Sequence, residues 1–158
     1  MSRVQLAINV ADVDEAVEFY SKLFATPPAK LRRGYANFAV EDPPLKLVLI
    51  EDPSRPPGSL NHLGVEVPST AEVMAARERL SATGLATVDE EGVTCCYALQ
   101  DKVWVVGPGG EPWEVYTVLA DADVRGDCLP DAGAGEAVCC TGDTDCRTGG
   151  SEPSIAAE

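Results

Sequence analysis

The sequence predicts an α+β fold of two β-α-β-β-β modules that pack together and form a cleft. Three observations support this prediction. Two segments with matching apolar patterns, 4–10 and 61–67, lie 57 residues apart, and each is followed within two residues by a helix start. Strand-like runs follow each helix. The length of 158 residues suits one domain with one core, so the modules should pack against each other.

Each helix is predicted from a capping pattern and an apolar face. Asp12 with Glu15, and Ser69 with Glu72, have the spacing of a capping box, in which the first side chain accepts from backbone N–H groups. Apolar residues then recur at helical spacing before a proline pair or a glycine. These are Val13, Ala16, Val17, Tyr20, Leu23 and Phe24 before Pro27, and Val73, Ala76 and Leu80 before Gly84.

The strand-like runs set the module boundaries. They are rich in β-branched and aromatic residues and cover residues 35–40, 45–50, 93–99, 102–106 and 112–118. We therefore expect one domain over residues 1–118, with modules at about 3–50 and 61–118 and a semi-rigid linker at 51–60 that contains three prolines. Packed as a pseudo-twofold pair, the modules would leave a cleft between their sheets.

Composition changes near residue 119. Residues 119–158 hold nine acidic residues and two arginines and show neither a helical nor a strand period, which predicts a mostly disordered tail. Its cysteines have two interpretations, as incidental thiols or as a flexible collector of soft metal ions. They are Cys128, Cys139, Cys140 and Cys146.

The acidic balance excludes two classes of partner. A formal net charge of -14 repels phosphate backbones and anionic lipid, so we expect neither nucleic acid nor a membrane surface. The sequence contains no apolar run of about 18 residues and no signal-peptide pattern, which predicts a cytoplasmic protein. In that reducing compartment the cysteines are expected to be thiols with a soft-metal or redox role.

Three residues of the repeated strands are candidate metal ligands. The 57-residue repeat places Gln5 and His62 at equivalent positions. A lone histidine is more often an ordinary core or surface residue. Glu114, however, lies in an otherwise apolar strand, where a buried carboxylate needs a cation or a hydrogen-bond donor. Strand alternation alone would also allow Glu114 to face solvent.

Cys95 and Cys96 form a vicinal pair inside the run 93–99. Two adjacent thiols can bond one soft centre such as As(III) or Cd(II). Neighbours in a regular strand point to opposite faces, so chelation requires a bulge, a twist or a strand end here. The alternative is that both residues are small buried hydrophobes.

The repeated modules, these ligand positions and the phrase GPGGEPWE at 107–114 resemble the vicinal oxygen chelate superfamily of glyoxalases, extradiol dioxygenases and bleomycin or fosfomycin resistance proteins. The resemblance covers about residues 3–118. It implies a metal in the cleft, held by Gln5, His62 and Glu114. A fourth ligand, often Glu in that superfamily, is missing, because Lys46 is the only polar residue of 45–50.

With Cys95, Cys96 and the cysteine-bearing tail, the chain is similar to the carbon-arsenic lyases of the ArsI type and to the CadI proteins. This similarity implies an Fe(II)- and dioxygen-dependent dioxygenase that cleaves trivalent organoarsenicals, such as methylarsonite or reduced aromatic arsenicals, to arsenite. It implies that the two thiolates bind the arsenic, and that Tyr97 and Tyr116 line the pocket. Ni(II), Co(II) or Mn(II) would be possible substitutes for the iron.

Two other functions remain open from the sequence. A binding protein could sequester cadmium or arsenic on its thiols without turnover. A glyoxalase or a thiol-transferring resistance enzyme of the same superfamily is the other alternative, although these commonly need a fuller ligand set. The chain could act as a monomer or as a homodimer with modules paired within or between chains.

Overall fold

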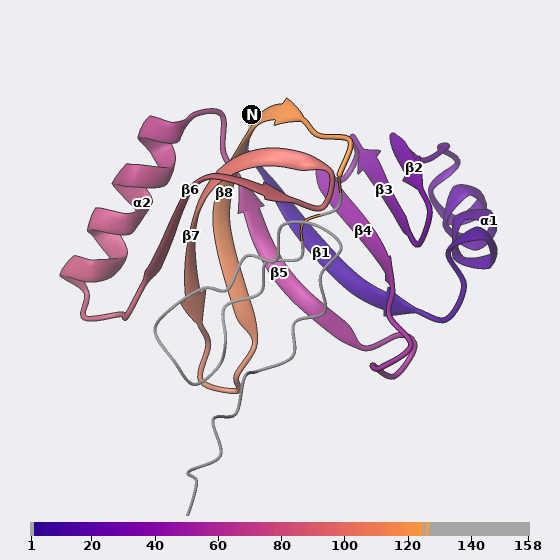
Figure 1. Cartoon of the computed structure of the whole chain (residues 1–158), viewed down its shortest axis with the longest axis horizontal. Coiled ribbons are helices and arrows are strands. Elements are labelled where there is room, and N and C mark those ends of the chain that lie inside the picture. The colour runs from indigo at the N-terminus through magenta and orange to yellow at the C-terminus, as the bar shows by residue number, and fades with distance from the viewer. Residues whose placement is uncertain (1, 125, 127–158) are drawn as a thin grey trace, which may run out of the picture.

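Each half of the chain contains one helix and four strands, in the same order (Figure 1). The fold is taken from a computed structural model that describes residues 2–124 and residue 126. The first half comprises β1 (Arg3–Val10), α1 (Val13–Phe24), β2 (Lys30–Arg32), β3 (Tyr35–Val40) and β4 (Leu45–Glu51). The second comprises β5 (Leu60–Glu66), α2 (Thr70–Ala82), β6 (Val88–Cys95), β7 (Ala98–Val106) and β8 (Pro112–Asp121). The two predicted modules are confirmed.

The eight strands form one curled sheet in the order β2-β3-β4-β1-β5-β8-β7-β6. The modules join where β1 pairs antiparallel with β5, with Gln5 opposite Gly64 and Ala7 opposite His62. Because the repeat equates Gln5 with His62 and Ala7 with Gly64, this register has the symmetry of a pseudo-twofold axis. The expected cleft between two sheets is instead the hollow of a single sheet.

Both helices begin as their capping patterns predict. The Asp12 carboxylate accepts a hydrogen bond from the backbone N–H of Glu15 at 2.9 Å, and the Ser69 hydroxyl accepts from that of Glu72 at 3.4 Å. α1 ends at Phe24, with its C-cap at Ala25 two residues before the proline pair, and α2 ends at Ala82, with its C-cap at Thr83 directly before Gly84. Local capping chemistry therefore determines where both helices lie.

The helices cover the outer face of the sheet and leave the inner face for polar residues. Val13 of α1 packs with Phe38 and Leu49, while Val73 and Leu80 of α2 pack with Val103. Since neighbouring strand residues alternate between faces, the residues between these core positions point inward. They include Lys46 of β4, Lys102 of β7 and Glu114 of β8, all buried.

The strands differ from the sequence expectations in several places. The short strand β2 was not predicted, and β8 continues through Asp121 into the expected tail. The predicted strand 93–99 is wrong, because a hairpin turn at Cys96 and Tyr97 divides it into the end of β6 and the start of β7. This turn lacks the glycine or asparagine that would mark it in a sequence.

Most of the predicted tail, with all four of its cysteines, lies outside the described residues. Within the described part of the chain, no helix is long and apolar enough to cross a membrane.

Candidate active site

Three buried polar side chains meet on the inner face at the junction of the modules. Gln5 on β1, His62 on β5 and Glu114 on β8 have exposed fractions of 3–4%. The Gln5 amide nitrogen lies 2.7 Å from Glu114 Oε1 and 3.0 Å from His62 Nε2, and the last two atoms are 3.4 Å apart. The strands carrying these three predicted ligands are neighbours in the sheet, which brings the residues together.

A chain of amide side chains sets the proton position on His62. The Asn9 amide nitrogen donates to the Ser59 carbonyl and hydroxyl oxygens, so its Oδ1 faces Asn61 and accepts from the Asn61 amide at 2.8 Å. The Asn61 Oδ1 then lies 2.7 Å from His62 Nδ1. An acceptor at this position requires a proton on Nδ1, so Nε2 carries the lone pair and faces Gln5 and Glu114.

Tyr116 contacts the other side of Gln5. Its hydroxyl donates to Gln5 Oε1 at 2.6 Å and also lies 3.1 Å from Glu66 Oε2. A half-turn of the Gln5 amide would direct its oxygen toward His62. The Tyr116 oxygen could then accept a hydrogen bond from the amide nitrogen, while its O–H group donates to the Glu66 carboxylate. Tyr116 can therefore accommodate either orientation of the amide.

Lys102 is the counterion of Glu114. Its ammonium donates to Glu114 Oε2 at 2.8 Å, and the two side chains have exposed fractions of 1% and 3%. Burial alone would raise the pKa of Glu114, but the charge of Lys102 and the contact with His62 lower it to about 2. The carboxylate therefore stabilises the fold above pH 4.5, and this contribution is lost as the pH falls toward 2.

The three side chains fit a divalent metal ion. An octahedral ion with bonds of ~2.1 Å separates neighbouring ligand atoms by about 3.0 Å, close to the three distances found here. His62 Nε2 and Glu114 Oε1 could serve as ligand atoms in the present geometry, and the amide half-turn would add Gln5 Oε1. No group of three His, Cys, Asp or Glu side chains among residues 2–124 and 126 has metal-binding geometry, so a metal site here would depend on Gln5.

Two residues without polar side chains, Val48 and Gly64, bear on the set of candidate ligands. The parallel pairs place Val48 opposite Ala7 and Glu114 opposite Gly64, so the pseudo-twofold equates Glu114 with the buried residue Val48. The fourth carboxylate is thus absent at its equivalent position, as the sequence predicts. Gly64 leaves room for the ligands, since a Cβ there would lie 3.1 Å from Glu114 Cγ and 3.3 Å from the Gln5 amide nitrogen.

The vicinal thiols lie at a strand end. β6 ends at Cys95, and the next two residues, Cys96 and Tyr97, have φ values of 51° and 63°, as in a type I′ hairpin. Because the chain turns here, the two cysteine side chains do not point to opposite faces as they would in a regular strand, and their sulfur atoms lie 3.6 Å apart. Cys96 and Tyr97 pack against an inner-face cluster that includes Ala7 and Val48. The geometric condition for two thiols to bind one centre is therefore met.

The Cys96 thiol is stable in its neutral form. The hydrogen bond shared with Cys95, in which the Cys96 proton is held, and then burial raise the pKa of the Cys96 thiol well above 9.0, with the charge of Lys102 as a smaller opposing effect. Cys96 therefore carries its proton at neutral pH in the free protein.

The left-handed backbone at Cys96 predicts that two variants lacking the Cys96 thiol differ in stability. Non-glycine residues in the left-handed region cost about 1–2 kcal/mol. We therefore expect Cys96→Gly to exceed Cys96→Ala in free energy of unfolding by about 1 kcal/mol. Urea denaturation of the two variants measures this difference, and equal stabilities would show that the left-handed backbone is not retained.

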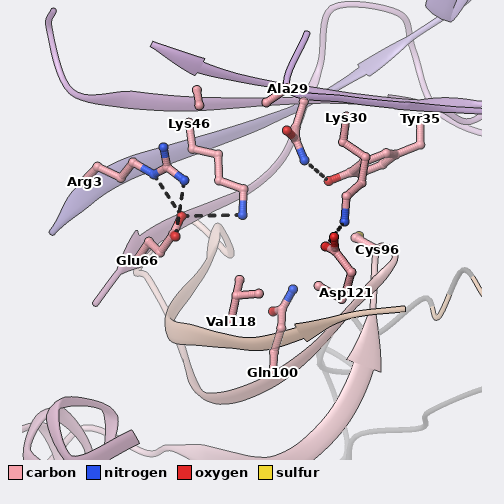
Figure 2. Close-up of a pocket in the computed structure, with 13 residues that line it drawn as sticks. Arg3, Ala29, Lys30, Tyr35, Lys46, Glu66, Cys96, Gln100, Val118 and Asp121 are labelled. Atoms are coloured by element: carbon pink, nitrogen blue, oxygen red, sulfur yellow. Dashed lines mark hydrogen bonds and ion pairs between the residues drawn. The ribbon is translucent and has the colours of Figure 1, made fainter. Parts of the chain in front are cut away.

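A cavity of about 280 Å³ opens beside Cys96 on the inner face (Figure 2). It lies between β3 and β4 of the first module and β7 and β8 of the second. The cations on its wall are paired: Arg3 and Lys46 with Glu66, and Lys30 with Asp121. The remaining lining residues are Ala29, Tyr35, Asn37, Ala39, Cys96, Ala98, Gln100 and Val118.

The two tyrosines that are predicted to line the substrate pocket lie away from the wall of this cavity. Neither Tyr97 nor Tyr116 lines this cavity. Tyr97 packs against the ring of Tyr35, with centroids 5.4 Å apart, and Tyr116 is fully buried against Gln5. Sequence reasoning missed Lys102 and Asn61 as contacts of the candidate ligands. Lys102 follows Gln100 and Asp101 in β7, so it does not stand out in the sequence as Glu114 does.

Comparison with known proteins places the chain in a family. Residues 3–115 match the family model described as the Glyoxalase/Bleomycin resistance protein/Dioxygenase superfamily. A trivalent organoarsenical cleaving enzyme of Thermomonospora curvata is 58% identical over 141 residues, which are 89% of either chain. The cadmium-induced protein CadI of Mycobacterium tuberculosis is 59% identical over 145 residues, covering 90% of this chain and 95% of that protein.

Solved structures share the fold at lower identity. The Mn(II)-bound glyoxalase from Novosphingobium aromaticivorans has a TM-score of 0.56 at 20% identity, and the match covers 79% of this chain and 42% of that one. Homoprotocatechuate 2,3-dioxygenase from Arthrobacter globiformis has a TM-score of 0.54 at 21% identity, with coverages of 78% and 42%. The chain belongs to the glyoxalase/bleomycin resistance protein/dioxygenase superfamily, in the group that includes the trivalent organoarsenical cleaving enzyme and CadI.

Proposed function

We propose that the protein is an Fe(II)- and dioxygen-dependent lyase that cleaves the carbon-arsenic bond of trivalent organoarsenicals and releases arsenite. The observation that carries the proposal is the placement of two sets of candidate ligands on one inner face. Gln5, His62 and Glu114 would form a nitrogen and oxygen site, and Cys95 and Cys96 would form a sulfur site. The relative named for organoarsenical cleavage supports this assignment at 58% identity.

The thiol pair would bind the arsenic by ligand exchange. Each S–H proton passes to a hydroxide on a trivalent arsenical of the type R–As(OH)₂, two As–O bonds break, two As–S bonds form and two waters leave. No oxidation occurs, and no charge is left buried in the product. This balance suits Cys96, which carries its proton before binding.

The other centre would hold the iron through His62 Nε2, Glu114 Oε1 and Gln5 Oε1. Three protein ligands leave positions open, and Fe(II) bound in such a set supplies the activation of dioxygen. Asn61 keeps the His62 lone pair directed at the site, and Lys102 occupies Glu114 Oε2, leaving Oε1 for the site. Ni(II), Co(II) and Mn(II) suit the same ligand atoms and are possible substitutes.

The placement of the two centres would orient the substrate. The turn that carries Cys96 packs over Ala7, which pairs with His62 across β1 and β5. An arsenical fixed to both sulfurs would therefore be held over the strands that carry the metal ligands. Fixing it there lowers the entropic cost of bringing its carbon to the reacting centre.

The alternative is thiol-based sequestration of cadmium or arsenic without turnover. It is supported by the 59% identity to the CadI protein and by the 3.6 Å spacing of the sulfurs, which also suits a bound soft ion. Oxygen uptake separates the two functions. The lyase consumes dioxygen when Fe(II)-loaded, reduced protein meets trivalent methylarsenic, whereas a sequestering protein does not. Turnover of a hemithioacetal would instead indicate a glyoxalase.

Tyr116→Phe tests how the Gln5 amide is oriented. The change removes the hydroxyl that now donates to Gln5 Oε1 and that would accept from the amide nitrogen once Gln5 turned toward the metal. Loss of such an orienting contact typically weakens metal binding 10- to 100-fold, so we expect Fe(II) affinity to fall by about tenfold. Anaerobic titration with Fe(II) measures the dissociation constant, and an unchanged value would contradict the role of Tyr116.

A further inference from the structure

We propose, resting on the function above, that Gln100 is a specificity residue that accepts a hydrogen bond from an N–H or O–H group on the organic substituent of the arsenical. Gln100 lies on β7, and its side chain extends toward the cavity beside Cys96 (Figure 2). An arylarsenical whose ring bears an amino or hydroxyl group has the matching chemistry.

The orientation of the Gln100 amide is fixed by its neighbour. Its nitrogen lies 3.2 Å from the carbonyl oxygen of Cys95. Because that oxygen can only accept, the amide nitrogen must face it and Oε1 must lie on the other side. Gln100 therefore supports the thiol turn through one amide atom and leaves the other available.

The free amide atom is an acceptor without a donor. Gln100 has an exposed fraction of 5%, and its Oε1 has no hydrogen-bond partner among the residues that the structure describes. Solvent does not satisfy the atom either, since it is buried. A buried acceptor left in this state is unfavourable and uncommon in folded proteins. A donor on a bound ligand would satisfy it, with a small rotation of the side chain opening the approach from the cavity.

The size and charge of the cavity define the ligand further. About 280 Å³ is far more than a methyl group needs and suits an aromatic ring. Lys46 and Lys30 already face the carboxylates of Glu66 and Asp121, so an anionic substituent would compete with a carboxylate for each cation. Among the buried polar side-chain atoms of the described residues, Gln100 Oε1 is the one without a partner, which favours a neutral donor on the ring.

Binding to the reduced, metal-free full-length protein tests the inference without any need for turnover. Calorimetry compares trivalent phenylarsenic, its 4-aminophenyl analogue and its 4-carboxyphenyl analogue. We expect the aminophenyl compound to bind about tenfold tighter than the phenyl compound, with no gain for the carboxyphenyl compound. Equal affinities for aminophenyl and phenyl, or a gain for carboxyphenyl, would overturn the inference.

Two variants assign the preference to one residue. Gln100→Met has a similar length but no acceptor, and its lost contact with Cys95 affects all three ligands alike. We expect it to reduce the aminophenyl-to-phenyl ratio to about one. The matched control, Asn37→Ala, removes an amide from the same cavity and should keep the ratio. A retained preference in Gln100→Met, or a lost one in Asn37→Ala, would overturn the assignment.

The outcome for Gln100 is distinct from that for the proposed function. If the wild-type protein binds none of the arylarsenicals, the thiol site itself is wrong and the lyase proposal fails with it. If it binds all of them with equal affinity, the thiol site stands and only the role of Gln100 fails.

Discussion

Replacing Cys95 or Cys96 by serine is expected to abolish cleavage of trivalent methylarsenic while leaving Fe(II) binding intact. A serine hydroxyl is nearly isosteric with the thiol but is a hard ligand that does not retain As(III). One remaining thiol gives a single As–S bond, which loses the chelate and the orientation of the carbon. Arsenite release and anaerobic Fe(II) titration measure the two properties separately.

The chain supplies a matched control for these variants. Cys139 and Cys140 form a second vicinal pair, outside the described residues. Replacing both by serine removes the same chemistry from the tail and should leave cleavage intact. Full turnover in Cys95→Ser or Cys96→Ser, or loss of turnover only in the tail variant, would place the arsenic elsewhere.

The second large effect concerns the buried pair of Lys102 and Glu114. Glu114→Gln leaves the Lys102 ammonium, which is 1% exposed, without its counterion. Lys102→Met likewise leaves the buried Glu114 carboxylate without its counterion. Removing one partner of a buried ion pair costs about 3–5 kcal/mol. We therefore expect each single variant of the metal-free protein to lose that much free energy of unfolding in urea denaturation.

The double variant Lys102→Met with Glu114→Gln should recover most of this loss, because neither charge then remains buried. Fe(II) binding should stay weak in the double variant, since the carboxylate ligand is gone. Glu18 and Lys22 form an exposed pair on α1 and provide the control, where Glu18→Gln should barely move the unfolding midpoint. A double variant no more stable than the single ones would contradict the buried pair as the cause.

The parts of the fold that local chemistry determines were predictable from the sequence. The capping residues Asp12 and Ser69 located the two helices, and the 57-residue repeat located β1 and β5 and with them Gln5 and His62. These features depend on nearest neighbours and on apolar periodicity, which a single sequence contains. Glu114 was identifiable because a charged residue in an apolar strand must have a partner.

The features that depend on long-range contacts were not predictable. The turn at Cys96 and Tyr97 has no local signal, and its left-handed backbone is retained by packing against β1 and β4. The pairing of Lys102 with Glu114 follows from the register of β7 and β8. The unpaired Gln100 oxygen depends on the Cys95 carbonyl five residues away. Each requires knowledge of which segments lie together in space.

Arsenic speciation tests the central claim most directly. Fe(II)-loaded, reduced protein is incubated with trivalent methylarsenic in air and, in parallel, without oxygen. The proposed lyase releases arsenite in air, in excess of the protein, and none under anaerobic conditions. Stoichiometric retention of unaltered methylarsenic in both samples would contradict the lyase function and would assign the protein to thiol-based sequestration.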